Sequence, residues 1–535
     1  MSVRDIIAEG LAGGWSAIDA ATADLQPVYE ADVVVIGTGA GGGTTAEILT
    51  QAGLRVIMVE EGTLPSLRDF KMDELSAYPL LYQEAMSRTT LDGAIAIMQG
   101  RIVGGSTTVN WTSSFRTPKE TLQHWTEVHK LKGFTPEAMQ PWFEDREKRL
   151  NISPWLVPPN ANNALLARGC EKLGWHAAVI PRNVVGCWNL GYCGMGCPAN
   201  AKQSMLVTTV PGALDRGAQL FYNLRAQRFH FKQDRIDALE CWAVDPASTD
   251  PNGRKVTLKA PHFVLAGSAI GSPGLLLRSQ APDPYARLGK RTFLHPVNIS
   301  LATMDEAVDP YHGAPQSIYS DEFVWKYGTS GSKMGFKLEV PPLHPGLAAS
   351  VLSLHGKELT ETMANLPRLH ATLALMRDGF HDESIGGQVV LRENGTPALE
   401  YEVTDYLWEG LRDAYLRMAE AQFAAGAKKV RLLHLDAGEY QSWSQAQAAI
   451  RDLKMAKYRT RLFTAHQMGG CAMGEDPRTS VVNSLGEHHQ IANLNIIDAS
   501  TFPTSIGANP QLSIYAMAAM QASRLAERLN ASAAA

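Results

Sequence analysis

The stretch ADVVVIGTGAGGGTTAEILT, residues 31–50, decides the fold class of this chain. Residues 31–37 form a continuous apolar, β-branched run, which is typical of a parallel strand buried on both faces. After a glycine-rich turn, residues 44–52 continue with helical spacing, and the run LRVIMVE at 54–60 predicts a second buried strand. The stretch therefore predicts a strand–helix–strand unit of a parallel α/β sheet.

The glycines between this first strand and the helix have the spacing G-x-G-x-x-G. Gly37 permits a tight turn, Gly39 lets the backbone approach a pyrophosphate, and Gly42 lets the helix pack close to the strand. A phosphate would then lie at a helix N-terminus, where free N–H groups and the helix dipole favour an anion. Glu60, 18 residues beyond Gly42, ends the second strand and can accept hydrogen bonds from an adenosine ribose. Glu61 is the alternative acid, but we expect it to point to the opposite face of the strand. The pattern predicts a dinucleotide site and does not separate NAD from FAD.

Length and composition limit the class of protein. The chain has 535 residues with 45% hydrophobic and 19% charged residues, which allows two or more folded units and excludes a disordered chain. A net charge of −5 with mixed signs gives no general basic surface for nucleic acid. We find no apolar run of about 18 residues, no secretory signal and no twin-arginine pair. These features predict a cytoplasmic protein without a transmembrane segment, and they leave peripheral contact with the inner membrane open.

The order of predicted elements implies a discontinuous nucleotide domain. Residues 221–267 alternate between strand and turn signals, as in a small antiparallel insertion that returns to a buried strand. The last part of the chain returns to a strand at 493–500 and a helix at 511–529. We expect an N-terminal arm (1–30), a cofactor domain (31–120, 200–290 and 456–535), and a second, α+β domain that includes a cysteine loop (121–199 and 291–455).

Three further segments make the prediction more specific. They are GRIVGGSTTVN at 100–110, LAGSAIGSPGLLLR at 265–278, and the segment 466–515, which begins HQMGGCAMG and ends with LNIIDASTFPTSIGANPQLSIY. In this order they resemble the glucose–methanol–choline (GMC) oxidoreductase family. The resemblance implies FAD rather than NAD, and an α/β fold with a Rossmann-like FAD-binding domain and an α+β substrate-binding domain.

The resemblance also assigns cofactor-binding residues. Gly105 and Ser106 would lie near the pyrophosphate, and Asn110 near the isoalloxazine. Gly267 belongs to the third glycine loop, and Asp498 would bind the ribityl chain. For Asp498 the alternative role is a helix or turn cap.

The residue before Asn110 bears on how FAD is held. Some family members attach FAD through a histidine at this position, where this chain has Val109, so we expect non-covalent FAD. Trp111, on the other side of Asn110, either lines the substrate pocket or packs in the core.

The C-terminal signature places His466 and Asn509 at the motif positions that face the flavin in the family. Alcohol oxidation needs a base for the hydroxyl proton, and histidine has a pKa near neutrality. The developing alkoxide needs a donor, and an amide N–H₂ supplies one without charge. Pro510 after Asn509 predicts a helix start with an Asn cap, and a helix N-terminus aimed at the flavin would stabilise its anionic reduced form. We expect His295, His488 and His489 to be structural or solvated.

Three of the six cysteines, Cys187, Cys193 and Cys197, fall within eleven residues as C-x5-C-x3-C-P. Thiolates among glycines can ligate an iron–sulfur cluster. The spacing resembles the catalytic subunits of bacterial FAD-dependent sugar dehydrogenases, in which three cysteines hold a [3Fe–4S] centre. The segment AKQSMLVTTVPGAL that follows resembles the long-chain alcohol oxidase branch instead. Reduced buried thiols, a disulfide or another metal are the alternatives.

Taken together, these features predict an FAD-dependent alcohol dehydrogenase or oxidase. It would act on a small-molecule primary alcohol, long-chain or aromatic, with His466 as base and Asn509 positioning the oxygen. A cluster would pass electrons to a quinone or cytochrome partner, whereas its absence leaves dioxygen or a soluble acceptor. The alternatives are a sugar dehydrogenase with an iron–sulfur centre and a non-catalytic flavin/iron–sulfur electron-transfer subunit.

Overall fold

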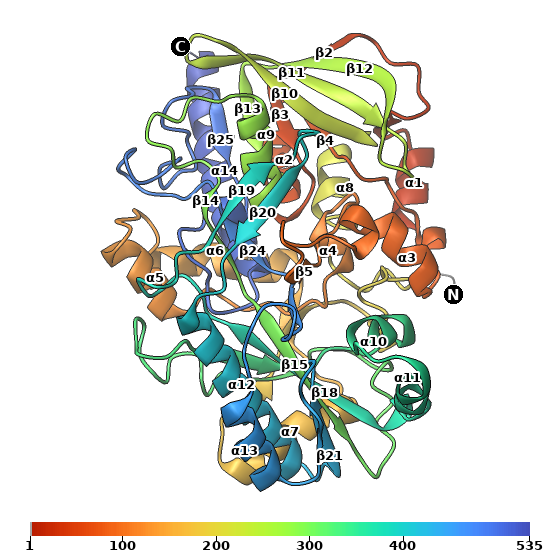
Figure 1. The fold of residues 1–535 in the computed structure, drawn as a ribbon. Coiled ribbons are helices and arrows are strands. Elements are labelled where there is room, and N and C mark those ends of the chain that lie inside the picture. The colour runs from red at the N-terminus through yellow and green to blue at the C-terminus, as the bar shows by residue number, and fades with distance from the viewer. Residues whose placement is uncertain (1–2, 535) are drawn as a thin grey trace.

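A computed structural model describes residues 3–534. The chain forms two lobes, one built on a parallel sheet and one on a large mixed sheet (Figure 1). Both chain ends lie with the parallel-sheet lobe, so the chain starts there, enters the second lobe and returns.

The first lobe is organised by a six-stranded sheet in which every neighbouring pair is parallel. Its strands, in spatial order, are β1 (Ser16–Asp19), β9 (Gln219–Tyr222), β4 (Val56–Val59), β3 (Val33–Ile36), β13 (His262–Leu265) and β25 (Leu494–Ile496). The two central strands β4 and β3 are buried at every residue, as their unbroken apolar runs predict. The predicted strand–helix–strand unit is confirmed: α2 (Ala40–Gln51) connects β3 to β4.

Helices of distant sequence cover this sheet. The last helix, α14 (Gln511–Ala534), packs against α2 and α6 (Pro136–Arg149), and α2 also packs against α8 (Thr209–Leu214). The C-terminal helix therefore lies beside the N-terminal glycine turn. Within residues 3–534, none of the helices, α14 included, has the length and apolar character needed to cross a bilayer.

The predicted antiparallel insertion is confirmed. Strands β10 (Leu224–Lys232), β11 (Arg235–Val244) and β12 (Pro251–Lys259) form a meander, and β2 (Val28–Glu30) joins it in parallel with β12. The chain then enters β13 of the parallel sheet, as the sequence predicts. The N-terminal arm contains α1 (Ile6–Ala12), but it also supplies β1 and β2 to the two sheets of this lobe.

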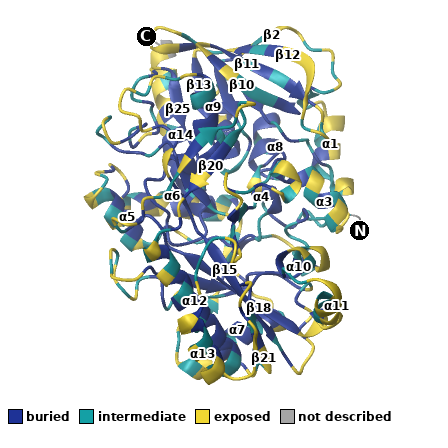
Figure 2. Ribbon diagram, viewed as in Figure 1, coloured by how far each residue is buried: buried dark blue, intermediate teal, exposed yellow. Residues whose placement is uncertain are grey.

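The second lobe is built on a nine-stranded sheet. Its strands are β22 (Glu439–Tyr440), β21 (Lys429–Leu432), β15 (Val297–Thr303), β18 (Leu369–Met376), β17 (Phe336–Glu339), β16 (Ile318–Ser320) and β7 (Ala178–Val179), with β23 (Leu462–Thr464) paired to β15 and β5 (Ile95–Ile97) paired to β23. On one face lie α12 (Asp405–Ala424), α7 (Ala161–Leu173) and α13 (Trp443–Asp452); on the other lie α10 (Pro345–Val351) and α11 (Gly356–Ala364). Figure 2 shows β15 and β18 buried between these layers, whereas α11 is largely exposed.

Smaller elements join the two lobes. A four-stranded sheet has the order β20 (Pro397–Tyr401), β19 (Gly387–Leu391), β14 (Lys290–Leu294) and β24 (Gln467–Gly469), and β6 (Ile152–Pro154) pairs with β8 (Pro181–Asn183). The remaining helices are α3 (Glu74–Leu81), α4 (Ser106–Val109), α5 (Lys119–Glu127) and α9 (Ser268–Arg278), with 3₁₀ turns at Leu67–Asp69, Gln83–Met86, Leu366–Arg368 and Ala499–Thr501.

The lobes exchange more of the chain than the predicted boundaries allow. Leu122 and Trp125 of α5 and Phe143 of α6 belong to the core of the parallel-sheet lobe, although the sequence assigns 121–199 to the substrate domain. Their apolar side chains pack there because α6 lies against α14. Conversely, β5 and β23 belong to the mixed sheet of the second lobe, although the sequence assigns both segments to the cofactor domain.

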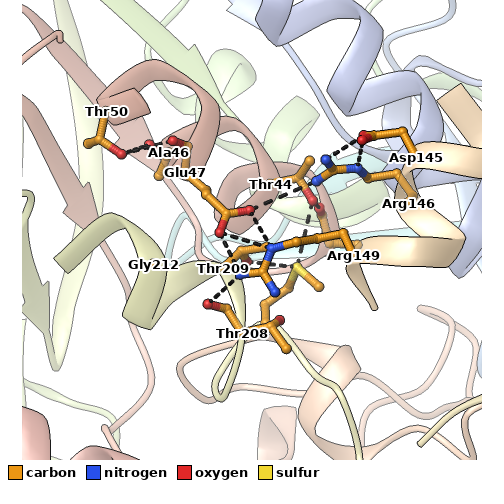
Figure 3. Close-up of polar contacts among 12 residues, drawn as sticks. Thr44, Ala46, Glu47, Thr50, Asp145, Arg146, Arg149, Thr208, Thr209 and Gly212 are labelled. Carbon is orange, nitrogen blue, oxygen red and sulfur yellow. Dashed lines mark hydrogen bonds and ion pairs between the residues drawn. The ribbon is translucent and has the colours of Figure 1, made fainter. Parts of the chain in front are cut away.

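A buried carboxylate fastens the glycine-turn helix to its neighbours (Figure 3). Glu47 of α2 has a side chain only 3% exposed, and its Oε1 lies 2.5 Å from Nη2 of Arg149 at the end of α6. The same guanidinium donates to the carbonyl of Thr208, before α8, at 3.0 Å. A Cβ at Gly212 of α8 would lie 2.4 Å from Glu47 Oε1, so a larger residue there would displace the Glu47 carboxylate. The ion pair joins α2 to α6, and the hydrogen bond from Arg149 to Thr208 connects both to the start of α8.

Candidate active site

A cavity of about 820 Å³ runs between the two lobes. All three glycine segments found in the sequence contribute to its lining, together with both ends of the C-terminal signature. Among the residues that line it are the predicted site residues Gly37, Gly39, Glu60, Gly105, Ser106, Asn110, Gly267, His466, Asp498, Asn509 and Pro510. Gly42 directly follows the lining residue Gly41 inside α2 and does not itself line the cavity. The fold therefore brings these distant segments to one place.

The first glycine turn has the close contacts that its spacing predicts. Gly37 has φ of +95°, and a Cβ there would lie 2.3 Å from the carbonyl oxygen of Ala266. A Cβ at Gly42 would lie 1.9 Å from the carbonyl oxygen of Gly37, so the helix could not approach the strand. At Gly39 the nearest atom to a Cβ is Gly105 Cα at 3.9 Å, which leaves the backbone open to the cavity. These contacts explain why Gly37 and Gly42 are glycines, and the approach of a pyrophosphate to Gly39 stays a prediction.

Glu60 and Glu61 both line the cavity, so the expectation that Glu61 points to the opposite face is wrong. Side chains alternate between the two faces only within a strand, and β4 ends at Val59, so the rule does not apply to Glu60 and Glu61. Glu60 accepts hydrogen bonds from the N–H and hydroxyl of Thr38, at 3.1 and 2.6 Å, and burial raises its pKa. Glu61 pairs with Arg225 at 3.0 Å, and nearby arginines lower its pKa. Ribose binding by Glu60 stays a prediction.

The second glycine segment lies against the first. Gly105 has φ of +55°, and a Cβ there would lie 2.9 Å from Gly39 Cα. Ser106 begins the short helix α4, and its hydroxyl accepts a hydrogen bond from the N–H of Gly100 at 3.0 Å. The amide of Asn110 donates to Gln511 Oε1 at 2.7 Å, at the start of α14. The segment therefore connects the glycine turn to the C-terminal helix.

Asp498 lies at the end of the parallel sheet, beside the third glycine segment. Its Oδ2 accepts hydrogen bonds from the N–H of Ser268 and the hydroxyl of Ser272, at 2.8 and 2.6 Å. Its Oδ1 accepts from the N–H of Ser500 at 2.7 Å, so it also caps the following 3₁₀ turn. Burial raises the pKa of Asp498. Gly267 precedes α9 and lies next to this carboxylate, so both lie at the cavity wall, where the resemblance places the cofactor.

His466 is hydrogen-bonded to His295, which we expected from the sequence to be structural or solvated. Its Nδ1 lies 3.0 Å from Nδ1 of His295, a residue that is 1% exposed. Burial and the charge of Lys337 lower the pKa of His466 to about 3, and the same causes together with His466 lower that of His295. Because His466 lines the cavity and its Nδ1 is engaged, Nε2 is the nitrogen left for a substrate. The neutral imidazole is the form that can accept a proton.

Asn509 is held by a lysine and a glutamate of β17. Lys337 Nζ donates to Asn509 Oδ1 at 3.2 Å, and Asn509 Nδ2 donates to Glu339 Oε2 at 3.2 Å. Neither Lys337 nor Glu339 was predicted, because both belong to a strand that the sequence does not connect with residue 509. The predicted Asn cap is wrong in its geometry: α14 begins at Gln511, and the first hydrogen bond of the helix goes to the carbonyl of Pro510. The amide of Asn509 is engaged by β17 instead.

The part of the cavity next to His466 is apolar. Odd-numbered residues of β15 and β18 face α10, and Val297, Ile299, Leu373 and Leu375 line the cavity from the sheet. The rest of this apolar wall comes from Pro341, Pro342, Leu343, Leu347, Val351 and Phe463. Trp111 also lines the cavity, which supports the first of its two expected roles. Gln316 adds one polar group.

The three clustered cysteines do not form a metal site. All six cysteines have free thiols, and among residues 3–534 no group of three or more His, Cys, Asp or Glu side chains is placed to hold a metal ion. Cys193 Sγ lies 3.8 Å from the buried guanidinium of Arg182, and Cys187 Sγ accepts from the N–H of Asn189. A [3Fe–4S] cluster therefore does not fit the arrangement of Cys187, Cys193 and Cys197.

The cysteine loop instead braces the second glycine segment. The ammonium of Lys202 donates to the carbonyls of Thr108, Asn110 and Cys193 at 2.7, 2.8 and 2.7 Å. The hydroxyl of Tyr82 donates to the carbonyl of Gly194 at 2.7 Å. The loop thus packs behind Asn110, and its glycines permit that close approach.

FAD fits the lining of the cavity. The N-terminus of α2 faces it with Gly39 in the N-cap position, so the first backbone N–H groups are open to a phosphate. Two glycine segments meet there, and Glu60, Glu61 and Asp498 add carboxylate acceptors to the same lining. Val109 beside Asn110 offers no nitrogen for attachment, and non-covalent binding of FAD stays a prediction.

Comparisons with known proteins agree with this geometry. Family models described as GMC oxidoreductase match residues 78–297 and 384–518. An uncharacterised GMC-type oxidoreductase of Mycobacterium tuberculosis is 30% identical over 502 residues, covering 93% of this chain and 76% of that protein. A long-chain-alcohol oxidase of Arabidopsis thaliana is 29% identical over 518 residues, covering 93% of this chain and 67% of that protein.

Solved structures show the same fold at low sequence identity. Pyridoxine 4-oxidase from Mesorbium loti superposes with a TM-score of 0.67 at 17% identity, covering 92% of this chain and 98% of that one. Formate oxidase superposes with a TM-score of 0.68 at 15% identity, covering 94% of this chain and 100% of that one. With the cavity and the two family matches, the chain is therefore a member of the GMC oxidoreductase family, FAD-dependent enzymes that act on CH–OH donors.

Proposed function

We propose that this enzyme oxidises primary alcohols that carry a long aliphatic or aromatic group to the corresponding aldehydes. The observation that carries this proposal is the apolar wall of the cavity that His466 also lines. The similarity to long-chain-alcohol oxidases of Arabidopsis thaliana, at 29% and 27% identity, supports the same substrate class.

The chain's own residues divide the chemistry as follows. Nε2 of His466 accepts the hydroxyl proton of the alcohol, and the free N–H of Asn509 donates to the oxygen as negative charge develops. When bound, FAD supplies the acceptor for the hydride that leaves the carbinol carbon. One C–H and one O–H bond break and the C=O bond forms, so the alcohol loses two electrons and two protons in balance.

The substrate class follows from what the wall can bind. Burying an apolar chain against aliphatic side chains is favourable by about 0.8 kcal/mol per CH₂ group. A hexose would place several hydroxyls there, and an unpaired buried hydroxyl costs about 1–3 kcal/mol. The polar groups beside this wall are few: Gln316 lines the cavity together with Thr112 and Ser113, and the Ser113 hydroxyl already donates to Gln316 Oε1 at 2.9 Å. We therefore favour an apolar alcohol over a sugar.

The alternative functions have less support. A sugar dehydrogenase or an electron-transfer subunit with an iron–sulfur centre would need the cysteines gathered around a metal, and they do not fit one. The pair His466 and Asn509 also argues for catalysis, because an electron carrier has no need of an alcohol base. A quinone or cytochrome acceptor, and a cytoplasmic location with peripheral contact to the inner membrane, stay predictions from the sequence.

Anaerobic stopped-flow spectroscopy of the FAD-loaded enzyme tests the proposal. We expect 1-dodecanol and benzyl alcohol, presented in mild detergent, to reduce the flavin, and glucose to leave it oxidised. His466→Ala should retain FAD and still be reduced by dithionite, but its reduction by alcohol should fall by about 10²–10⁴-fold. Reduction by glucose but not by either alcohol, or an unchanged rate in His466→Ala, would contradict the proposal.

A further inference from the structure

Three buried side chains form a closed ring at the edge of the cavity. Lys337 Nζ lies 3.2 Å from Asn509 Oδ1, Asn509 Nδ2 lies 3.2 Å from Glu339 Oε2, and Lys337 Nζ lies 3.1 Å from Glu339 Oε1. The side chains of Lys337 and Glu339 are 4% and 0% exposed. Lys337 and Glu339 are two residues apart on β17, so they share one face of the strand. Of the three, Asn509 alone lines the cavity.

The chemistry of this ring allows only one orientation of the Asn509 amide. An ammonium has donors and no acceptor, and a carboxylate has acceptors and no donor. Rotating the amide by 180° would place its N–H₂ against Lys337 and its oxygen against Glu339, so both contacts would be repulsive. The amide nitrogen has two N–H groups, and Glu339 takes one. The second N–H is free for the cavity.

Burying the Lys337–Glu339 ion pair costs free energy of folding, which points to a functional reason for its presence. A buried pair is often no more stabilising than apolar residues of the same volume, because both charges lose their hydration. The surroundings of Lys337 are partly aromatic: its ammonium lies 2.9 Å from the ring centroid of Phe115 and 4.7 Å from that of Tyr319. A hydrophobic pair could fill this site, and it would leave the Asn509 amide free to rotate.

We propose that Lys337 and Glu339 are positioning residues of the active site, which fix the Asn509 amide so that an N–H points at the substrate oxygen. This inference rests on the proposed function for its catalytic consequence, but the orientation itself does not depend on any substrate. Because the two residues act through Asn509, neither needs to touch the alcohol or the cofactor.

The charge of Lys337 has a second effect in the same direction. Burial is the larger cause of the lowered pKa of His466 and of His295, and the charge of Lys337 lowers both further, which helps to keep the base neutral. Burial lowers the pKa of Lys337 itself to about 8, against the attraction of Glu339. The other groups that face the ammonium are Asp321, whose charge favours the protonated lysine, and the ring of Tyr319. One ammonium thus orients the donor and keeps the base unprotonated.

The test compares three forms of the FAD-loaded enzyme: wild type, Lys337→Met with Glu339→Leu, and Lys326→Met. The double variant removes both charges, so that no unpaired charge stays buried. Lys326, with a side chain 43% exposed in the same lobe, is the control for loss of a positive charge. FAD content and Tm establish that each form is folded and loaded.

The first readout is independent of substrate. In protein labelled with ¹⁵N-asparagine, the side-chain N–H resonances of Asn509 are assigned by their loss in Asn509→Asp. We expect one of them to be shifted and protected from hydrogen exchange in the wild type and in Lys326→Met. In the double variant that protection should be lost. Unchanged Asn509 resonances in a folded double variant would overturn the proposal.

The second readout is the limiting rate of flavin reduction by alcohol. We expect this rate to fall by about 10–100-fold in the double variant. Complete loss of an oxyanion donor typically lowers kcat by roughly 10²–10³-fold, and here the donor is misoriented but not removed. The KM should change little, because the apolar wall is intact. A limiting rate equal to that of the wild type would also overturn the proposal. If no alcohol reduces the wild-type flavin, the proposed function has failed, and the resonances of Asn509 still decide the orientation.

Discussion

His295 and His466 share a hydrogen bond between their Nδ1 atoms, which are 3.0 Å apart. In the antiparallel pair of β14 and β24, Leu294 lies opposite Gln467. His295 follows Leu294 and His466 precedes Gln467, so the pairing brings the two histidines together. Among the described residues, Nε2 of His295 has no hydrogen-bond partner. Only one tautomer makes His466 a base: its Nδ1–H donates to His295, which leaves Nε2 free to take a proton.

His295 should therefore control the tautomer of His466. Replacing it with leucine removes the acceptor for Nδ1–H, and we expect the limiting rate of flavin reduction to fall by about 10–100-fold with FAD retained. His295→Asn offers an oxygen at the position of Nδ1 and should keep more of the rate than His295→Leu. Stopped-flow reduction by a primary alcohol measures both. Equal rates in both variants would show that the hydrogen bond has no role.

The lowered pKa of His466 predicts the pH dependence of flavin reduction. A base is active when neutral, so the rate should be constant above its pKa and fall as the pH drops through it. Because burial and Lys337 hold the pKa of His466 well below 6.5, we expect a plateau between pH 6 and pH 7 and an acidic loss only at lower pH. A second fall should appear on the alkaline side, as Lys337 loses its proton near its pKa of about 8. Lys337→Met should move this acidic limb to higher pH. A wild-type limb centred above pH 6.5 would contradict the prediction.

Much of the cofactor lobe could be predicted because its signals are local. Gly37, Gly39 and Gly42 are constrained by their own turn and by the strand beside it, and a short stretch of sequence contains both. The expected separation of the Glu60 and Glu61 side chains failed for a related reason: alternation along a strand holds only within the strand, and β4 ends at Val59, one residue before Glu60.

The support of the catalytic pair could not be predicted, because it is non-local. Lys337 is 172 residues from Asn509, and His295 is 171 residues from His466. No periodicity connects such pairs; the pairing of β14 with β24 and the place of β17 in the mixed sheet do. A lysine and a glutamate two apart in an otherwise apolar strand, FKLE, were the available signal, since buried charges need partners.

The cysteine loop gives a prediction about metal content. Since Cys187, Cys193 and Cys197 do not surround a common metal position, we expect anaerobically purified protein to show flavin absorption bands without a brown shoulder. Iron and labile sulfide should be far below one equivalent. Replacing all three cysteines with serine should leave the flavin spectrum unchanged. Stoichiometric iron that is lost in the serine variant would restore the cluster predicted from the sequence.

The apolar wall predicts a preference for chain length that one residue can shorten. Ile299 lines the cavity from β15, so Ile299→Phe should weaken binding of dodecanol, with a KM raised about tenfold, and affect butanol little. Leu301, on the same face of the same strand, belongs to the cluster behind the wall but not to the lining, so Leu301→Phe is the matched control. Each added ring costs about 1–3 kcal/mol of stability. Equal effects of both variants on the two alcohols would argue against this wall as the substrate site.

The ion pair between Glu47 and Arg149 predicts a stability effect without a direct catalytic one. Glu47→Gln leaves the guanidinium without its carboxylate in a site where Glu47 is 3% exposed. Breaking a buried pair costs about 3–5 kcal/mol, and we expect the lower end because Arg149 is 33% exposed and water can solvate it. Glu147→Gln breaks the more exposed pair with Arg116, and should cost at most about 1 kcal/mol. Urea unfolding of both variants, with and without FAD, measures the difference. Because α2 begins at the glycine turn, Glu47→Gln should also weaken FAD retention, whereas Glu147→Gln should not. If the two variants retain FAD equally well at equal stability, the Glu47–Arg149 ion pair has no role in cofactor binding.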